Sequence, residues 1–224
     1  MKTSSILLLA FFIGFISSGY SQIVNLTTVD GRPILQEKNN NIDGSPYFSE
    51  TYQDSKIILQ NESLVREAFG RVNLLNQTFE FKNDGKLLEV TFAEIKSLEL
   101  ENSSNGIVVK FVNGTQVGLS KSMLYQVVYQ GESFDVVKEL SYKLSDVQVD
   151  GYSQSEAKRK VMESEELFLI LSGKASSFKR NQKSISSVLP QNFQQKLDQY
   201  AKSKKLNWKT DENLIEILEY LDNN

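Results

Sequence analysis

Carboxylates and basic side chains are the reactive groups that this sequence offers, because it contains no histidine and no cysteine. Without these residues a Ser-His-Asp or Cys-His nucleophilic system cannot be built, and most zinc sites lose their ligands. The sequence also lacks the glycine-rich phosphate-binding patterns of nucleotide and dinucleotide sites. We therefore expect no catalytic, cofactor-binding or metal-binding residues, and we predict that the protein is not an enzyme.

Two carboxylate chemistries remain open as alternatives. Glycoside hydrolysis needs only a pair of Asp or Glu side chains. The candidates for such a pair are Glu163, Glu165 and Glu166, or Asp146 and Asp150. Asp146, Asp150 and Glu156 could instead offer oxygen ligands to calcium, but they lack the spacing of a known calcium loop. The simpler interpretation, which we favour, is that these carboxylates are solvated charges of a polar loop.

A basic stretch near the C-terminus is the second chemical signal. Residues 173–209 contain nine basic residues and one acid, Asp198, whereas residues 210–224 contain five acids and no base. Contact with an anionic surface, such as lipid head groups or acidic polysaccharide, is one interpretation, and each exposed lysine would contribute about 1 kcal/mol. The candidate contact residues are Lys196, Lys202, Lys204 and Lys205. The alternative is a solvated face that the acidic last segment partly neutralises.

Alternating apolar residues predict that most of the chain is built from antiparallel strands. Phe79 and Phe81 alternate with Glu80 and Lys82, which is typical of a half-buried strand with the charged pair on its other face. The Asp-Gly pair at 84–85 then predicts a tight hairpin turn. A later run places Ile107 inward in the same alternating way. Further strands are expected at 55–60, 64–75, 88–92, 95–101, 107–112, 123–129, 134–144, 167–171 and 174–178.

The end of the chain is predicted to be helical. Asn181 can cap a first short helix, Pro190 suits the start of a second, and Thr210 can cap a third. The second helix should bury an apolar stripe, which leaves Lys196 and Lys202 pointing to solvent. Residues 145–164 are polar, and 156–163 could be a short helix or loop. The fold class is therefore α+β: an antiparallel β-rich body, as a meander, curved sheet or barrel, followed by two or three short C-terminal helices.

The N-terminus is typical of a secretory signal peptide. Lys2 precedes an apolar run, Ile6–Ile16, and small residues follow it up to a cleavage site before Gln22. The apolar run is too short to span a membrane, which takes about 20 residues. Without cysteine the chain cannot be a lipoprotein. We expect an exported protein, periplasmic or extracellular, with no transmembrane helix and no disulfides.

Composition changes divide the chain into four parts: a signal peptide at 1–21, a flexible mature N-terminus at 22–43, a β body at 44–180 and a helical segment at 181–224 that packs on or beside the body. Glycosylation sequons would matter only if the chain were exported by a eukaryote. They occur at Asn25, Asn61, Asn76, Asn102 and Asn113.

Several short motifs together resemble a group of uncharacterised exported proteins of Bacteroidota. The motifs are Tyr20–Gln22, Gly44–Tyr47, the 79–92 hairpin, Phe178–Ile185 and a tail that ends near Tyr220. The resemblance covers most of the chain beyond the signal peptide and implies export and a similar fold. It implies no activity.

A non-catalytic envelope or secreted protein with a binding or structural role fits these observations best. Its partner would be an envelope component or another protein, with a weak contact to an anionic surface and none to nucleic acid. One alternative is a carrier of an apolar ligand in the curved sheet, which would require an apolar cavity of several hundred Å³. The other is a carboxylate-based hydrolase, which would require two carboxyl groups that face each other across a cleft.

Overall fold

A computed structural model describes residues 23–25, 31–34, 42–61, 65–102, 104–146 and 159–223. The predicted signal peptide lies outside this part of the chain. The described residues form 13 strands in one sheet, two short 3-10 helices and three α-helices. The first elements are β1 Ile23–Asn25, β2 Arg32–Pro33, β3 Ile42–Asp43, β4 Gln53–Leu59, β5 Val65–Asn73, β6 Thr78–Asn83, β7 Lys86–Thr91, η1 Phe92–Glu94 and β8 Ile95–Glu101. The others are β9 Val108–Asn113, η2 Gly114–Val117, β10 Leu124–Gln130, β11 Asp135–Asp146, β12 Arg159–Leu171, β13 Lys174–Phe178, α1 Gln182–Val188, α2 Gln191–Ser203 and α3 Asp211–Asn223.

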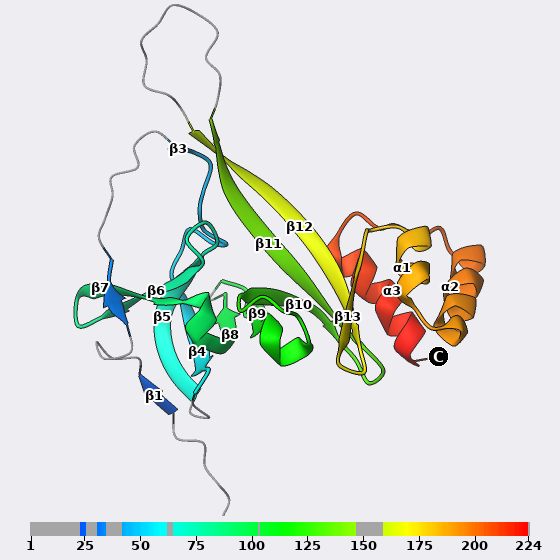
Figure 1. Cartoon of the computed structure of the whole chain (residues 1–224), viewed down its shortest axis with the longest axis horizontal. Coiled ribbons are helices and arrows are strands. Elements are labelled where there is room, and N and C mark those ends of the chain that lie inside the picture. The colour runs from blue at the N-terminus through cyan, green and yellow to red at the C-terminus, as the bar shows by residue number, and fades with distance from the viewer. Residues whose placement is uncertain are drawn as a thin grey trace, which may run out of the picture.

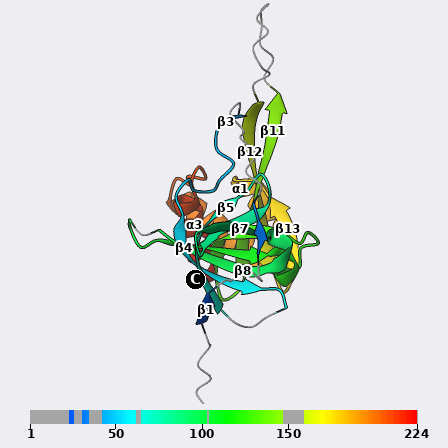
Figure 2. The same ribbon diagram turned by 90° about the vertical axis from the view of Figure 1, so that its left-hand side faces the viewer.

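Two antiparallel meanders make up the sheet. Strands β4 to β7 form the first and β8 to β13 form the second, and the two are joined because β8 pairs with β4. The strands of the first meander curl at one end of the molecule, and the three helices gather at the other (Figures 1 and 2). The structure thus confirms the α+β class with an antiparallel-dominated, open sheet. None of the helices among the described residues is long and apolar enough to cross a membrane.

Tight turns lie where glycine allows them. Asp84 and Gly85 have φ values of 48° and 74°, as a type I′ hairpin turn requires, so the turn predicted at 84–85 is confirmed. Ser172 and Gly173 have φ values of 50° and 75° and connect β12 to β13 in the same way. In both hairpins the turn geometry fixes the register of the two strands.

The curled end of the sheet encloses the first hydrophobic core. Phe79, Phe81, Ile57 and Leu98 are fully buried there.

Two expectations for this region are wrong. Glu80 is buried rather than on an open face, because Arg71 and Asn73 of the neighbouring strand hydrogen-bond to it. Ile107 is 58% exposed, because it precedes β9 and extends beyond the part of the sheet that covers the core.

The sequon residue Asn113 has a structural role. Its side-chain nitrogen donates to the carbonyl oxygens of Phe92 (3.0 Å) and Ile95 (2.9 Å), and its side-chain oxygen accepts from the backbone N–H of Thr115. These bonds hold the η1 segment, which connects β7 to β8, next to the start of η2. Because Asn113 is fully buried, it is not accessible to glycosylation in the folded protein.

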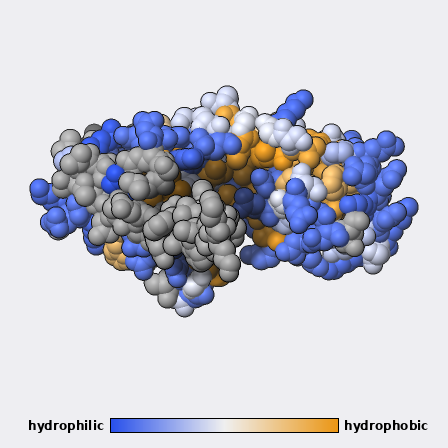
Figure 3. All heavy atoms as spheres, turned by 90° about the horizontal axis from the view of Figure 1, so that it is seen from below, coloured by the Kyte–Doolittle hydropathy of each residue, from blue (hydrophilic) through white to orange (hydrophobic). Residues whose placement is uncertain are grey.

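The helices cover one face of β10–β13 and form a second hydrophobic core with it. Leu167 and Leu169 of β12 contribute to this cluster from the sheet, and Leu197 and Leu218 contribute from α2 and α3. The predicted caps are confirmed: the side chain of Asn181 accepts from Ser184 N, and Thr210 Oγ1 accepts from Asn213 N. Apolar residues gather in the middle of the lower face, between the strand-rich and helical ends (Figure 3).

Strands β11 and β12 form a long two-stranded ribbon that extends away from the body (Figure 1). Its pairs run from Asp135 opposite Ile170 to Asp146 opposite Arg159. The expectation of a short helix or loop at 156–163 is therefore wrong for residues 159–163, which are strand; residues 156–158 lie outside the described residues. In the region predicted to be flexible, 22–43, the three short strands β1, β2 and β3 pair with the main sheet.

Candidate functional site

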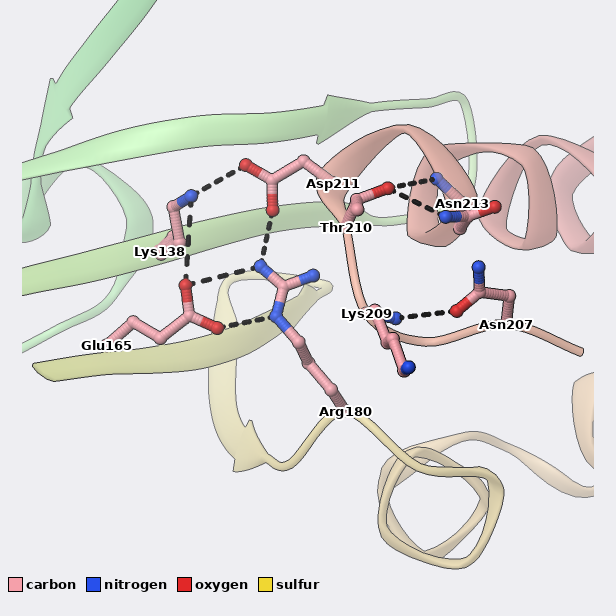
Figure 4. A network of polar contacts seen from close by, with 8 residues as sticks. All are labelled: Lys138, Glu165, Arg180, Asn207, Lys209, Thr210, Asp211 and Asn213. Atoms are coloured by element: carbon pink, nitrogen blue, oxygen red, sulfur yellow. Dashed lines mark hydrogen bonds and ion pairs between the residues drawn. The ribbon is translucent and has the colours of Figure 1, made fainter.

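Four charged side chains from four separate elements meet where the helices join the sheet (Figure 4). Lys138 lies on β11, Glu165 on β12, Arg180 between β13 and α1, and Asp211 at the start of α3. Lys138 Nζ is 2.6 Å from Asp211 Oδ2, and Arg180 donates both to Asp211 and, through two nitrogens, to Glu165. We call these four residues the junction network. With two cations and two carboxylates, it carries no net formal charge.

Partial burial gives the junction network its electrostatic strength. Burial alone would raise the pKa of Asp211, but hydrogen bonds from Arg180 and Lys138 outweigh it and hold that pKa below its usual value. Asp211 also lies in the first turn of α3, where the helix dipole favours a negative charge. Removing one member of such a network would leave its partners buried without compensation. The network therefore fixes β11, β12 and the β13–α1 link relative to α3.

A groove of about 720 Å³ lies beside the junction network. Ten of its twelve lining residues are polar or charged, and Leu167 and Phe178 are the apolar exceptions. The other lining residues are Glu139, Ser141, Lys143, Ser164, Glu165, Glu166, Lys179, Arg180, Ser177 and Ser184. A groove of this character differs from the apolar cavity that an apolar-ligand carrier would need.

Glu139 is the most buried carboxylate of the groove. It lies directly opposite Glu166 in the β11–β12 register. Lys121 Nζ donates to Glu139 at 2.9 Å, and the hydroxyl of Tyr125 donates to it at 3.2 Å. Burial, and then the charge of Glu139, raise the pKa of Tyr125. The charge of Glu139 is thus compensated by the ion pair with Lys121, whereas Glu166 is exposed to solvent.

The groove lies along an open part of the β12 edge. On the side of β12 away from β11, β13 pairs only as far as Leu167, opposite Phe178. At the other end, β3 pairs only with Arg159 and Lys160. Within the described part of the chain, residues 161–166 therefore have no neighbouring strand on this side. We call residues 161–166 the open edge. Residues 162–166 of it are solvent-exposed.

Hairpin geometry shows which backbone groups point out of the open edge. Leu171 and Lys174 flank the two-residue turn between β12 and β13, so they form a hydrogen-bonded pair. Every second residue back along β12 directs its N–H and C=O to the same side. Glu163 and Glu165 therefore present their backbone groups to the open edge, while the backbone of Ser164 faces Ser141 on β11.

The carboxylates that the sequence suggested as a catalytic pair are not arranged as one across a cleft. Glu163 and Glu165 lie two residues apart on the same face of β12, and Glu166 lies on the opposite face. Glu165 is bound to Arg180. Asp146 is exposed at the end of β11. Asp150 and Glu156 lie outside the described residues, which contain no cluster of three or more acidic residues able to hold a metal ion.

The candidate lysines are in three different situations. Lys196 is not solvent-directed as expected: it lies over the Phe193 ring and donates to the carbonyl oxygen of Leu221 at 3.1 Å, because its long side chain reaches the last turn of α3. Lys204 is paired with Glu216. Lys202 and Lys205 are exposed, and no described residue forms a hydrogen bond or ion pair with their side chains. Their contact with an anionic surface stays a prediction.

A second ion network was missed from the sequence. The guanidinium of Arg71 donates twice to Glu80 at 3.0 Å and lies 3.5 Å from the centre of the Tyr47 ring, while Asn73 donates to the other oxygen of Glu80 at 2.9 Å. We call Arg71, Asn73 and Glu80 the hairpin network. A signal was present: Arg71 and Glu80 have opposite charges and are nearly equidistant from the turn at 74–77. No comparable local pattern marks the junction network or the open edge.

Comparison of the chain with family models, with curated proteins and with solved structures finds no match. The open edge, the groove beside it and the junction network are the features that bear on function.

Proposed function

We propose that the protein is an exported, non-catalytic binding protein that accepts an extended peptide segment of a partner protein at the open edge of β12. The observation that carries this proposal is the gap between β13 and β3 on the side of β12 away from β11, where residues 162–166 are exposed and no strand of the described part of the chain pairs with them. Adding a strand to a sheet edge is a common mode of peptide recognition, in which main-chain hydrogen bonds supply the affinity.

The dimensions of the gap suit one short strand. Six residues, 161–166, separate the pairs made by β3 from those made by β13. At about 3.3 Å per residue they span roughly 20 Å, the length of an average strand. Glu163 and Glu165 each offer an N–H donor and a C=O acceptor there. A peptide in this position would continue the line of β13 along the groove.

The surroundings of the gap support a preformed site. Exposed strand edges promote aggregation, and proteins usually cover, shorten or charge them. Here the gap is short, it carries three glutamates and it ends at a paired strand on each side. The junction network fixes Arg180 and the start of α3 beside it. A rigid site loses less conformational entropy when it binds a ligand.

A proline substitution at the open edge tests the proposed function. Proline has no N–H and is tolerated where that N–H faces out of the sheet. Glu163→Pro therefore removes an edge donor without breaking a backbone hydrogen bond to β11, although it also removes the side-chain contact with the cross-strand neighbour Tyr142, and we expect the variant to keep a melting temperature close to that of the wild type. Random heptapeptides displayed on phage are selected on the purified wild-type protein, and enriched peptides are resynthesised. We expect Glu163→Pro to bind them at least about tenfold more weakly, as the loss of a strand contact predicts.

Amide hydrogen exchange supplies a second measurement and its internal control. Binding of an enriched peptide should slow exchange at Glu163 and Glu165, whose N–H groups point out of the edge. Exchange at Ser164 should change little, because its N–H faces β11 already. If no peptide is enriched, or if exchange slows elsewhere and not at these two amides, the proposed function is wrong.

Export is tested separately. The signal-like pattern of residues 1–21 supports it, and the mature protein should begin at Gln22. Mass spectrometry of the protein from its native source decides the point, and an intact N-terminus in the cytoplasmic fraction would refute it.

A further inference from the structure

The charges along the open edge point to the chemistry of the peptide. Glu165 is bound to Arg180, and Glu139 is bound to Lys121. Glu163 has a different partner, the hydroxyl of Tyr142, which lies directly opposite it on β11. Burial, and then the charge of Glu163, raise the pKa of Tyr142 to about 12, so the hydroxyl stays a neutral donor. Among the described residues, no lysine or arginine pairs with Glu163.

The register of β13 fixes what an added strand would meet. Phe178 lies opposite Leu167, and the chain then leaves the sheet with Arg180 beside Glu165. An added antiparallel strand that pairs with the backbone of Glu165 would therefore place its residue two positions later opposite Glu163. Directly opposed residues share one face of the sheet, with Cβ atoms about 5 Å apart. A lysine or arginine at that position would reach the Glu163 carboxylate.

The following position of the added strand would face Met162. The Met162 side chain is 52% exposed and lies on the other face of β12 from Glu163. An apolar residue opposite it would remove apolar surface of both side chains from water, which is favourable. The open edge thus suits a basic residue followed by an apolar one, in the direction in which β13 runs.

A second copy of this chain fits the edge poorly. Two-fold antiparallel pairing of two β12 edges, centred on Ser164, would place Glu163 of each copy opposite Glu165 of the other. Like charges directly opposite each other on neighbouring strands are destabilising. The same glutamates that would attract a basic strand therefore oppose self-association through this edge.

We propose that the occupant of the open edge is an extended segment of a different protein, with lysine or arginine opposite Glu163 and an apolar residue opposite Met162. This inference rests on the proposed function, since it specifies the peptide that the edge accepts. The Glu163 carboxylate supplies charge selection, and the backbone groups of Glu163 and Glu165 supply strand pairing.

The test uses the phage-selected peptides and a charge exchange. We expect enriched peptides to share a basic residue followed by an apolar one. Replacing that basic residue by glutamate should weaken binding to the wild type about threefold to tenfold, and the effect should shrink as salt is added. Glu163→Lys should reverse the preference, so that it binds the glutamate peptide better than the basic one. Glu101→Lys is the matched control, because Glu101 is also an exposed strand glutamate with no ion pair to another described residue but lies on β8, and it should leave the preference unchanged.

The outcomes separate the inference from the proposed function. If peptides bind and slow exchange at Glu163 and Glu165, but basic and acidic versions bind equally to the wild type and to Glu163→Lys, the charge inference is wrong and strand addition stands. If no peptide binds, the proposed function fails. A concentration-dependent dimer in light scattering that Glu163→Pro dissociates would overturn the inference in favour of a second copy as the occupant.

Discussion

The hairpin network and the junction network are both partly buried ion networks, but they are assembled in different ways. Arg71 and Glu80 lie on neighbouring strands, nine residues apart, and connect one hairpin to the segment that covers it. Lys138 and Asp211 are 73 residues apart, and their network joins two strands, a link and a helix. The first stabilises a local unit. The second couples the helices to the sheet and fixes one wall of the groove.

Burial also differs between the two networks. The difference lies in the carboxylates: Glu80 is 4% exposed, whereas Asp211 and Glu165 are 24% and 40% exposed. The cations are buried to a similar degree, with Arg71 at 17%, Arg180 at 18% and Lys138 at 10% exposed. Removal of Glu80 leaves Arg71 without a carboxylate partner, whereas removal of Asp211 leaves Glu165 beside both cations, so the first loss should cost more. The local network should therefore contribute more to stability, and the junction network more to the position of the helices.

Removing the carboxylate of the hairpin network should have the largest effect. Glu80→Ala leaves the Arg71 guanidinium and the Asn73 amide without their acceptor. We expect the free energy of unfolding to fall by about 3–5 kcal/mol. Chemical denaturation measures this, with Glu89→Ala as the control, because Glu89 lies opposite Glu80 but pairs with the exposed Arg32. Equal losses in the two variants would contradict the difference in burial.

Neutralising Asp211 should have a smaller effect that depends on pH. Asp211→Asn leaves Lys138 and Arg180 to share Glu165, and we expect a loss of about 2–3 kcal/mol at pH 7. The pKa of Asp211 is lowered in the folded protein, so its contribution is complete above the unfolded pKa of about 4 and is lost as the pH falls through the folded pKa. The difference in stability between wild type and variant should therefore shrink below about pH 4. A difference that stays constant down to pH 2 would show that the Asp211 charge is not its source.

How far the sequence predicts these features depends on the distance between the residues involved. The Asp-Gly turn at 84–85 and the caps at Asn181 and Thr210 follow from a few adjacent residues, and all three are confirmed. The Arg71–Glu80 pair lay within reach of the same reasoning, because the two residues belong to consecutive predicted strands that pair in the structure. The junction network could not be predicted in this way, because no local spacing relates Lys138 to Asp211.

The open edge was also beyond prediction, for a different reason. Residues 159–166 contain few apolar positions, so the periodicity that reveals a strand is missing, and residues 156–163 were expected to be a short helix or loop. In the structure this part of β12 pairs with β11 in a ribbon that buries little on either face. Its free side depends on where β13 ends and where β3 begins, and both positions depend on residues far away in the sequence. The direction of the Lys196 side chain was predicted wrongly for a related reason. The apolar stripe of a helix identifies the buried positions, but it does not show which carbonyl oxygen a long side chain can reach.

The two type I′ turns offer a matched comparison of the two regions. Gly85 closes the hairpin that contains Glu80, and Gly173 closes the hairpin at the end of the open edge. Both have positive φ, and a side chain at either position would meet no atom within 4 Å, so only backbone strain opposes substitution. Gly85→Val and Gly173→Val should each cost about 1–3 kcal/mol. Thermal unfolding measures both, and an unchanged melting temperature in either variant would contradict the strain argument for that turn.

Substitution of exposed lysines outside the junction network should have the smallest effect, and the effect should be on binding to an anionic surface rather than on stability. Lys202 and Lys205 are exposed without partners among the described residues, whereas Lys204 is paired with Glu216. If the basic stretch contacts an anionic surface, each unpaired lysine should contribute about 1 kcal/mol, and salt should screen the contribution. A double variant, Lys202→Gln with Lys205→Gln, should therefore bind vesicles rich in phosphatidylserine more weakly than the wild type at low salt. Lys204→Gln is the matched control and should change binding less, because Glu216 already neutralises that charge. If the wild type binds anionic vesicles no better than neutral phosphatidylcholine vesicles even at low salt, these lysines are solvated charges and the surface contact is refuted.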